Sequence, residues 1–335
     1  MTGGAGFIGS HFVSRVLRRY SHYHVLVLDS LTYAGSLSNL EVHFQNKRFE
    51  FVRGNVCDEN MVANCVSDAD VIVNFAAETH VDRSLESANE FLKTDILGVH
   101  VLLEAVKKFD IRTFLHVSTD EVYGSVDEGA SLETDSFNPS SPYSASKASA
   151  ELIISAYAKS FGINSLITRG SNTYGPNQYP EKLIPLFITR LLDGQTVPLY
   201  GDGLQRRDWI HVDDHCKGID IVLHKGSPGE AYNIGGGKRV SNIEIAQRLA
   251  ALTHQPDERI RFVKDRPGHD TAYSIDTSKV QALGYEPEHD FDTGLAETVE
   301  WYINHEQWWR QALERETKEG NFAARWYGNG FNAEI

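Results

Sequence analysis

The sequence predicts an α/β protein with a doubly wound parallel sheet, covered by helices on both faces, and a smaller α/β C-terminal substrate domain. Three observations support this fold class. Short apolar runs alternate with helix-length segments through the first half of the chain, as in repeated strand–helix–strand units. The runs are almost continuously apolar, which is typical of strands buried on both faces. A glycine-rich turn near the start leads into the first helix.

The predicted strands are short segments rich in Val, Ile, Leu and Phe. They span residues 24–29, 48–52, 71–75, 113–117 and 165–168. Helix-length segments lie between them, among them residues 9–19 and 94–109. In the first of these, Ile8, Phe12 and Val16 recur every four residues and so share one apolar face. Because strands alternate with helices, we expect neighbouring strands to run parallel.

The glycine turn indicates a dinucleotide site. Gly3, Gly6 and Gly9 stand three residues apart, which allows a tight turn, close backbone approach to a pyrophosphate and close helix packing. The predicted strand that follows ends in Asp29, 20 residues after Gly9, a spacing that suits a carboxylate bonded to a ribose diol. No Arg follows Asp29 within ten residues, and a carboxylate repels a 2′-phosphate. We therefore expect NAD rather than NADP on a Rossmann domain.

The domain boundary is expected near Asn172, where glycine turns become frequent at residues 175–177, 201–203, 226–229 and 235–237. We expect a Rossmann domain over residues 1–172. Residues 173–309 are expected to bind mainly the substrate, with some segments returning to the first sheet. Residues 310–335 fit neither part, and we expect Trp326, Tyr327 and Phe331 to belong to a disordered end rather than an added packing segment.

Composition narrows the possible partners. Of 335 residues, 41% are hydrophobic, which is enough to bury a large core. Lys and Arg number 32 against 46 Asp and Glu, and the net charge of −14 argues against nucleic acid. The three widely spaced cysteines suggest neither a disulfide framework nor a metal site. No segment has the length of a membrane span or the pattern of a signal peptide, so we expect a soluble, cytoplasmic protein without a membrane partner.

Two groups of residues suggest chemistry. Tyr143 and Lys147 stand one helical turn apart, and an ammonium near a phenol lowers the pKa of the phenol. Thr119, Asp120 and Glu121 follow a predicted strand, at the edge where ligands bind in such sheets. Two adjacent acids could form a solvated turn or a helix cap. The functional interpretation is a carboxyl pair with one protonated and one ionised member.

These motifs resemble the extended short-chain dehydrogenase/reductase family, and within it the 4,6-dehydratases that act on dTDP-glucose. The matching segments are TGGAGFIGSH (2–11), LDSLTYAGSLSNL (28–40), NFAAETHVDRS (74–84), STDEVYG (118–124), SPYSASKASAE (141–151), RGSNTYGPNQYPEKLIP (169–185), PLYGDGLQRRDWIHVDDH (198–215) and DRPGHD (265–270). The resemblance covers the chain up to about Trp309. STDEVYG discriminates within the family, because related epimerases usually lack the Asp-Glu pair.

The resemblance implies a reaction sequence on the sugar of a nucleotide-diphospho-sugar. Tyr143, poised by Lys147, takes the proton of the 4-hydroxyl, which Thr119 also hydrogen-bonds, and hydride passes from C4 to NAD. Glu121 then removes the C5 proton, and protonated Asp120 donates to the departing 6-hydroxyl. The hydride returns to C6, and the C5 position is reprotonated. The product would be a 4-keto-6-deoxy sugar, a precursor of rhamnose and other deoxysugars.

The resemblance also implies the contacts of both ligands. The cofactor-binding residues would be Gly3, Gly6, Phe7, Ile8, Gly9, Asp29, Ser30, Thr32, Asp58, Ala76, Ala77, Thr94, Tyr143, Lys147 and Thr173. The substrate-binding residues would be His80, Thr119, Asn172, Lys182, Leu183, Pro198, Tyr200, Arg207, Asn242, Asp265 and His269. Arg207 is expected to bind the diphosphate, because guanidinium binds phosphate in a bidentate fashion, although Arg206 stands beside it. A homodimer through residues 94–109 and 144–161 would follow.

The start of the chain departs from the family. Relatives carry a strand ahead of the glycine turn, whereas only Met1 and Thr2 precede Gly3 here. Loss of this central strand should be destabilising. We expect a misplaced start, because a GTG valine codon can be read as a start and relatives often carry Val at this position.

Other functions remain open from the sequence. A UDP- or CDP-glucose 4,6-dehydratase is an alternative, since recognition of the base depends on the shape of a pocket. A nucleotide-sugar epimerase or decarboxylase of the same family is less favoured. A non-catalytic NAD-binding regulator is favoured least, because Asp120, Glu121, Tyr143 and Lys147 are all present.

Overall fold

The computed structural model describes residues 1–126, 128–318, 322 and 326. Its main sheet contains the strands predicted for the first half of the chain, with ends shifted by a residue or two. In spatial order these are β2 (Phe49–Arg53), β1 (Val25–Asp29), the bridging residue Thr2, β3 (Val71–Asn74), β4 (Thr113–Thr119), β5 (Ser165–Gly170) and β9 (Ala231–Ile234). All pairings are parallel.

The centre of this sheet is occupied by the start of the chain. Thr2 bridges Leu28 on β1 and Asn74 on β3, both in parallel. The Thr2 amide donates to the Val73 carbonyl at 3.0 Å, and the Met1 amino group donates to the Leu26 carbonyl at 2.7 Å. Residues 1 and 2 therefore connect the two halves of the sheet.

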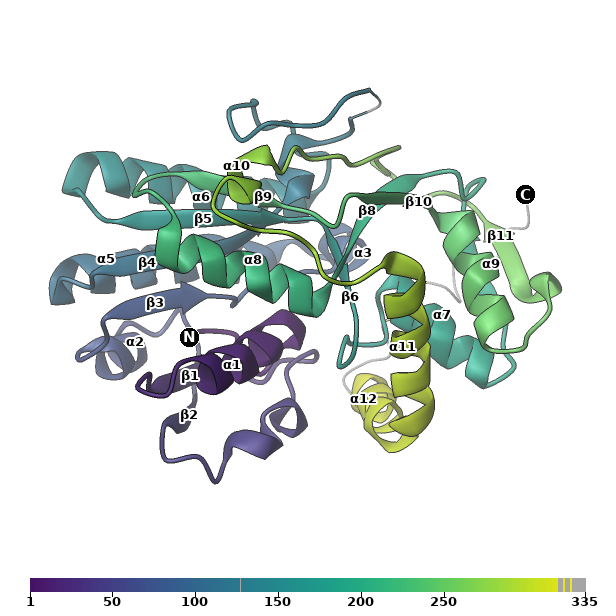
Figure 1. Ribbon diagram of the computed structural model, residues 1–335, viewed down its shortest axis with the longest axis horizontal. Coiled ribbons are helices and arrows are strands. Elements are labelled where there is room, and N and C mark those ends of the chain that lie inside the picture. The colour runs from purple at the N-terminus through teal and green to yellow at the C-terminus, as the bar shows by residue number, and fades with distance from the viewer. Residues whose placement is uncertain (127, 319–321, 323–325, 327–335) are drawn as a thin grey trace.

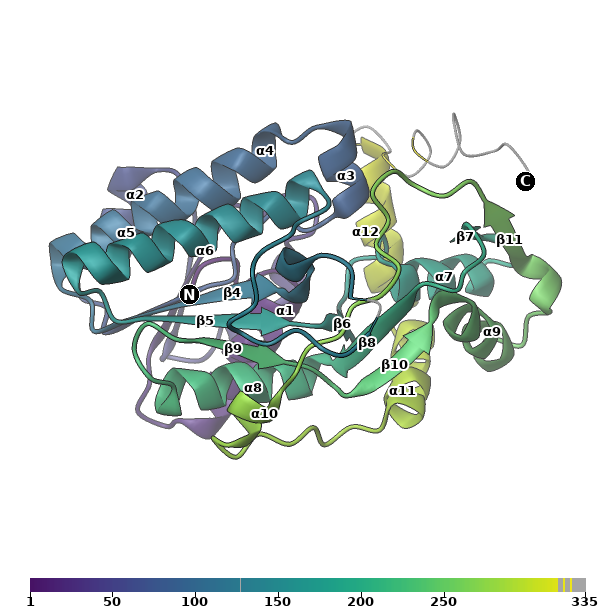
Figure 2. The same ribbon diagram turned by 90° about the horizontal axis from the view of Figure 1, so that it is seen from above.

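Helices cover the sheet on both faces (Figure 2). One face carries α1 (Phe7–Arg19), α8 (Val212–Lys225) and α10 (Ser278–Gln281), and the other carries α2 (Glu59–Val66), α5 (Gly98–Phe109) and α6 (Pro142–Phe161). Successive residues of a strand point to opposite faces of the sheet and so enter two separate hydrophobic cores. Val73 and Leu115 pack with α1 and α8 on one face, whereas Ile72 and Phe114 pack against α2, α5 and α6 on the other. The predicted doubly wound α/β fold is confirmed.

The second region lies beyond one end of the main sheet (Figure 1). Its three-stranded sheet comprises β10 (Lys238–Ser241), β8 (Arg206–His211) and β6 (Asn172–Tyr174), and a parallel pair comprises β7 (Val197–Tyr200) and β11 (Ile260–Val263). The helices α7 (Leu183–Leu192), α9 (Asn242–Leu252), α11 (Phe291–Asn304) and α12 (Glu306–Lys318) pack with them. Phe187, Leu249, Leu295 and Trp309 belong to the shared core.

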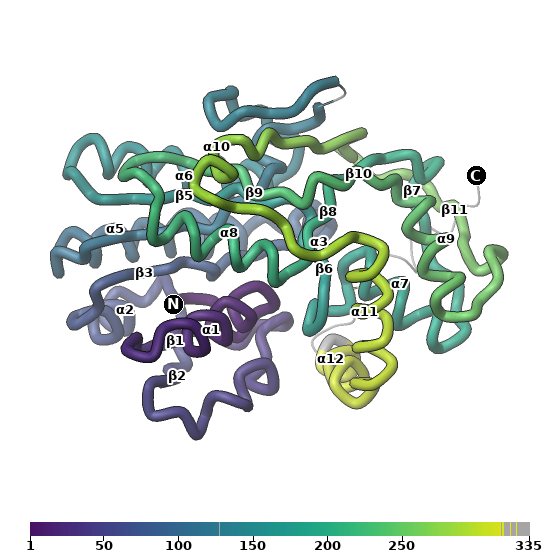
Figure 3. Tube along the Cα trace, in the orientation of Figure 1, coloured from purple at the N-terminus to yellow at the C-terminus, as the bar shows by residue number. Residues whose placement is uncertain are grey.

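The chain crosses between the two regions more than once. Strand β9 pairs with β5 and helix α8 packs on α1, although both follow residue 172. After β11 the chain crosses to α10 beside β9 and then returns to α11, as the tube in Figure 3 shows. The main sheet is thus completed by segments from the second half of the sequence.

The beginning of the C-terminal end is helical, whereas the sequence suggested disorder from Arg310. Helix α12 continues to Lys318 and buries Ala312, so the expected disordered end does not begin at Arg310. Phe322 is also buried, with 2% of its surface exposed. The expectations for Tyr327 and Phe331 lie outside the described residues.

Helical structure around residue 94 differs from the regular helix expected over 94–109. After α3 (Val81–Glu86) and α4 (Asn89–Phe91), a π-helical turn covers Leu92–Leu97 and leads into α5. Buried Asp95 in this turn accepts from the Glu78 amide at 3.0 Å and from Ser146 Oγ at 2.6 Å. We attribute the wider turn to these bonds, which hold Asp95 inward, and such turns often occur at functional sites.

Other short elements complete the fold. Single 3₁₀ turns cover Leu37–Asn39, Glu41–His43, Asp120–Tyr123 (η4) and Asp257–Arg259. Among the described residues, no helix combines the length and the apolar character needed to cross a membrane.

Candidate active site

The glycine loop forms a cradle that excludes side chains. Gly3 has a φ of +68°, and a Cβ atom added there would lie 2.5 Å from the Ala76 amide nitrogen. A Cβ atom added at Gly9 would lie 2.3 Å from the Gly3 carbonyl oxygen. Helix α1 begins after Gly6 with no side-chain cap found among the described residues. Its first amides are therefore available to phosphate, so the loop fits the pyrophosphate of a dinucleotide.

Asp29 closes one end of this cradle. Its Oδ2 accepts from the Ala5 amide at 2.9 Å and its Oδ1 accepts from the Leu31 amide at 2.8 Å. Burial raises the pKa of Asp29, while these two hydrogen bonds lower it. Each carboxylate oxygen retains a second lone pair, which suits the hydroxyls of a ribose diol and not a 2′-phosphate.

The predicted cofactor residues meet in one cavity. Its lining includes all of them except Asp58: Gly3, Gly6, Phe7, Ile8, Gly9, Asp29, Ser30, Thr32, Ala76, Ala77, Thr94, Tyr143, Lys147 and Thr173. Asp58 instead caps α2, where its Oδ1 accepts from the amides of Asn60 and Met61 at 3.0 Å each. Its side chain is exposed, so any contact with the cofactor would be made from the rim.

The predicted catalytic residues line the same cavity. Thr119, Asp120 and Glu121 stand where β4 ends and η4 begins, and Tyr143 and Lys147 come from the first turns of α6. The start of α6 is well defined because Ser141 and Ser144 cap each other reciprocally and proline follows at residue 142. This cap places the tyrosine and lysine one turn apart on the inner side of the helix.

The lysine predicted to take part in catalysis, Lys147, is buried. Lys147 Nζ donates to the Val117 carbonyl at 2.8 Å and lies 3.2 Å from His116 Nε2. Burial lowers the pKa of Lys147, and the nearby Asp95 and Glu151 carboxylates act in the opposite direction.

The pKa of Tyr143 behaves differently from the sequence-based expectation. Burial raises it well above its usual value, and the charges of Glu121 and Asp95 raise it further, whereas a hydrogen bond with Thr119 lowers it. Lys147 alone therefore does not turn the phenol into a phenolate. The positive nicotinamide ring of NAD would add the missing stabilisation of the phenolate when it binds in this cavity.

The two carboxyls are differentiated by their neighbours. Burial, the charge of Glu121 and that of Asp208 raise the pKa of Asp120 well above its usual range. Burial also raises the pKa of Glu121, but Arg266, Lys182 and Arg207 oppose that shift. Asp120 is thus the member that holds a proton, and Glu121 the member that can ionise.

The predicted substrate residues are divided between two places. Thr119, Asn172, Lys182 and Leu183 line the main cavity, and Asp265 lines a second hollow together with Gly201, Gln205 and Phe262. The remaining residues lie outside both linings: His80, Pro198, Tyr200, Arg207, Asn242 and His269.

Contacts connect most of this second set. Tyr200 Oη donates to Asp82 Oδ2 at 3.0 Å and packs edge-on against His269. His269 Nδ1 lies 2.6 Å from Asp265 Oδ1. Asn242 Nδ2 and Asp265 contact opposite ends of the Gln205 amide. Asp265 and His269 are thus connected to Tyr200 and, through Gln205, to Asn242, and we call these four residues the substrate cluster.

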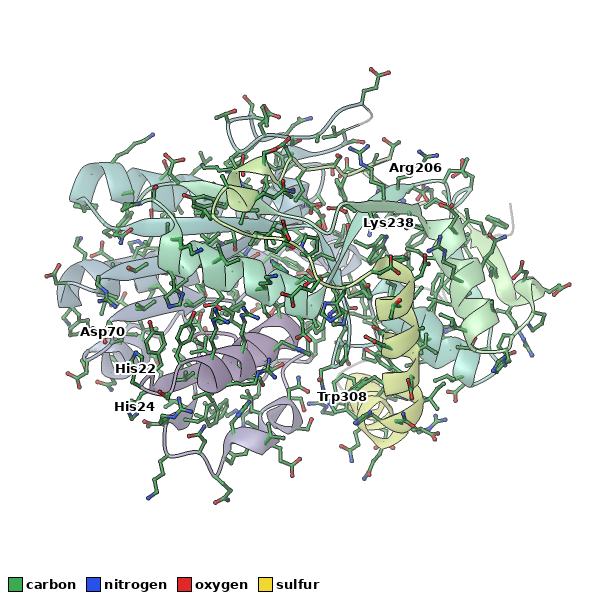
Figure 4. The ribbon with its side chains drawn as sticks, viewed as in Figure 1. His22, His24, Asp70, Arg206, Lys238 and Trp308 are labelled. Atoms are coloured by element: carbon green, nitrogen blue, oxygen red, sulfur yellow. The ribbon has the colours of Figure 1, made fainter. Side chains whose placement is uncertain are left out.

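The two adjacent arginines are clearly distinguished. Arg206 lies exposed at the start of β8 (Figure 4), whereas Arg207 is buried. The Arg207 guanidinium donates to the Asp270 carbonyl at 2.8 Å and lies 4.3 Å from the centre of the Tyr273 ring. Only Arg207 of the pair faces inward.

Sequence reasoning missed several charged residues of the site. Arg266 Nη1 donates to buried Asp82 Oδ1 at 2.8 Å, and its charge lowers the pKa of Glu121. Glu78 lines the main cavity, and burial together with Asp95 and Glu181 raises its pKa to about 7. Arg266, Asp82 and Glu78 lie within quoted motifs, DRPGHD and NFAAETHVDRS, which was the available signal.

Two described residues of the C-terminal end touch predicted substrate residues. Trp326 Nε1 donates to Tyr200 Oη at 3.0 Å, and Phe322 packs edge-on against His80 with ring centres 5.5 Å apart. The two aromatic rings stack on each other. Nothing in the sequence indicated that this end returns to the site.

Comparison with known proteins agrees with this arrangement. A family model described as GDP-mannose 4,6 dehydratase matches residues 1–298. A dTDP-glucose 4,6-dehydratase of Actinoplanes sp. is 49% identical over 92% of this chain and 98% of its own length. The low-salt glycan biosynthesis protein Agl12 of Haloferax volcanii is 47% identical over 92% of this chain and 99% of its own.

Solved structures show the same likeness. The dTDP-glucose 4,6-dehydratase DesIV of Streptomyces venezuelae, with NAD and TYD bound, superposes with a TM-score of 0.92. It is 47% identical, and the match covers 93% of this chain and 98% of that one. A UDP-glucose 4-epimerase of Thermus thermophilus in complex with NAD gives a TM-score of 0.84 at 31% identity, covering 91% and 98%.

Proposed function

The chain belongs to the GDP-mannose 4,6 dehydratase family, and because its relatives include dTDP-glucose 4,6-dehydratases, we propose that it converts dTDP-glucose into dTDP-4-keto-6-deoxy-glucose with NAD as cofactor. It is an NAD-dependent dehydratase, a lyase that removes water. The observation that carries the proposal is the Asp120–Glu121 pair in the same cavity as Tyr143 and Lys147. An oxidoreductase needs only the second pair, whereas elimination of water needs an acid and a base as well.

The first chemical step is oxidation at C4 of the sugar. Tyr143, as the phenolate that Lys147 stabilises, accepts the proton of the 4-hydroxyl, and Thr119 hydrogen-bonds the same oxygen. The cavity lined by Gly3, Asp29 and Tyr143 would hold NAD, which would supply the acceptor for the C4 hydride and its donor to C6, while C5 regains a proton. Exclusion of water by the buried side chains of Tyr143 and Lys147 strengthens these electrostatic effects.

The second step is elimination of water across C5 and C6. The new ketone at C4 makes the C5 proton acidic, and Glu121 accepts it. Asp120 donates its proton to the 6-hydroxyl, which leaves as water. The different surroundings of the two carboxyls supply these different roles, because Arg266 and Lys182 favour the ionised form of Glu121.

Basic side chains are proposed to hold the diphosphate. Lys182 donates to the Thr79 carbonyl and Arg207 to the Asp270 carbonyl, so both cations are oriented before substrate arrives. Asp265, Pro198, Tyr200, Asn242 and His269 are proposed to bind the nucleoside. Asp29, Ser30, Thr32 and the other residues of the cavity lining are proposed to bind NAD.

UDP-glucose is the second candidate substrate. A trifunctional Arabidopsis thaliana protein that includes UDP-glucose 4,6-dehydratase is 42% identical over 92% of this chain and 47% of its own length. The relatives named dTDP-glucose 4,6-dehydratase are more similar, which favours dTDP-glucose.

The surface and the cysteines bear on partners and location. We propose a homodimer through α5, α6 and the turn before α5. Leu97, Leu152 and Phe161 expose 46, 61 and 54% of their surfaces on these elements, which suits burial against a second copy. The three free cysteines agree with a cytoplasmic location.

A direct assay tests the function. Purified protein is incubated separately with dTDP-glucose, UDP-glucose and CDP-glucose, and the products are analysed by mass spectrometry. The proposal predicts loss of one water from dTDP-glucose, with the highest kcat/KM for that substrate. Faster turnover of UDP-glucose would reassign the substrate, and epimerisation without loss of water would reject the dehydratase.

A further inference from the structure

A row of polar residues crosses the middle of the apolar main sheet. Thr2, Asn74 and His116 are register partners on three adjacent strand positions, so their side chains share one face. All are buried, with exposures of 3, 1 and 0%. Thr2 Oγ1 lies 2.5 Å from Asn74 Oδ1, and Asn74 Nδ2 lies 2.9 Å from His116 Nδ1. Buried polar groups are costly unless bonded, so such a row calls for an explanation.

The row ends at the catalytic lysine. His116 Nε2 lies 3.2 Å from Lys147 Nζ, and α6, which carries Lys147, packs on the same face of the sheet. Burial and the neighbouring Lys147 charge hold the pKa of His116 well below its usual range, so the imidazole is neutral. A neutral imidazole offers one donor and one acceptor nitrogen.

The hydrogen bonds of the row can run in either direction. With Asn74 Nδ2 facing His116 Nδ1, the imidazole proton lies on Nε2 and faces Lys147 in its amine form. A half-turn of the Asn74 amide presents its oxygen instead, so the proton moves to Nδ1 and Nε2 accepts from the ammonium. The Thr2 hydroxyl serves both arrangements, because it can donate and accept.

We propose that His116 is a positioning residue for Lys147: its imidazole accepts a hydrogen bond from the lysine ammonium, and Asn74 and Thr2 hold the imidazole in place from its other ring nitrogen. The proposal rests on the role assigned above to Lys147 in the oxidation at C4. The other charged groups that face Lys147 are Asp95 from the π-helical turn and Glu151 from α6. His116 differs from them because it holds the ammonium in place without neutralising its charge.

The test compares two amides that differ by one methylene. In His116→Gln the side-chain amide reaches as far as Nε2 and can still accept from Lys147. In His116→Asn it reaches only as far as Nδ1 and leaves Lys147 without this partner. Thr168→Val is the control, because Thr168 is equally buried in the same sheet but pairs with Val117, on the opposite face from His116.

The readout is the pH dependence of kcat/KM for dTDP-glucose. Loss of the acceptor destabilises the ammonium, which raises the pKa of Tyr143. His116→Asn should therefore move the acid limb to higher pH by about one unit. His116→Gln should move it by less than half as much, and Thr168→Val should leave it in place.

Two results would overturn the proposal: an acid limb of His116→Asn that coincides with the wild type, or equal shifts for both amides. Thr2→Val removes only a hydroxyl and is the variant least able to disturb folding. It should shift the limb in the same direction by a smaller amount, and an opposite shift counts against the row. Lys147→Met separates the two levels: if it leaves the oxidation at C4 intact, the role assigned to Lys147 is wrong, whereas absence of water loss in the wild type would reject the proposed function itself.

Discussion

Replacing Glu121 with glutamine removes one negative charge and one proton acceptor from the cavity while keeping the shape of the side chain. The account assigns Glu121 to abstraction of the C5 proton, which follows the oxidation at C4. A positioned general base contributes about 10²- to 10⁴-fold. Elimination should slow by that factor, or about 3 to 5 kcal/mol in the barrier.

The oxidation step should respond in the opposite sense. After burial, the charge of Glu121 is the main cause that raises the pKa of Tyr143, and it also raises the pKa of Asp120. Glutamine lowers both pKa values. The acid limb of the oxidation, where Tyr143 gains a proton, should move to lower pH by about one unit. The alkaline limb of the elimination, where Asp120 loses its proton, should also move to lower pH.

Rapid mixing with dTDP-glucose measures both steps in one experiment. Absorbance of NADH reports the oxidation, and release of the 4-keto-6-deoxy product reports the completed cycle. In Glu121→Gln, NADH should accumulate while product formation falls. The assigned roles are wrong if Glu121→Gln abolishes NADH formation as completely as Tyr143→Phe does.

The remaining predictions concern the cofactor site and stability. Asp29→Asn should weaken NAD binding about 10- to 100-fold, because a charge-assisted hydrogen bond is lost; calorimetric titration measures this, and an unchanged Kd would refute the ribose contact. Gly3→Ala should abolish NAD binding, because its Cβ would lie 2.5 Å from the Ala76 amide nitrogen; normal binding would show that the loop is not the cradle. Glu151→Ala leaves buried Arg169 without the carboxylate that it bonds at 2.7 Å and should cost about 3 to 5 kcal/mol of unfolding free energy. In the same urea titration Glu306→Ala, which breaks the exposed pair with Arg310, should cost less than about 1 kcal/mol, and equal losses would contradict this reasoning.

The parts of the fold and the site that could be predicted are those encoded locally. The strands β1, β3, β4 and β5 are largely apolar runs, and such runs have few alternatives to burial in a parallel sheet. Tyr143 and Lys147 are related by one helical turn, and the glycine loop is a contiguous motif. Local spacing is sufficient for such features, because one element positions every member.

The residues that escaped prediction are paired through tertiary structure. Arg266 and Asp82 are 184 residues apart in the chain and meet only because the segment after β11 folds against α3. From the sequence alone, His116 is indistinguishable from the other residues of a buried strand, because its partner Asn74 is known only from the strand register. The π-helical turn around Asp95 also depends on a distant partner, Ser146 Oγ. No periodicity or spacing in the sequence reports such contacts.

The central claim is that oxidation at C4 makes the C5 proton removable by Glu121, so that water leaves across C5 and C6. Reaction of the wild-type protein with dTDP-glucose in deuterated water, followed by mass spectrometry of the product, tests it most directly. The account predicts loss of one water and incorporation of one deuterium at C5. Loss of water without label at C5, or no loss of water, would contradict it.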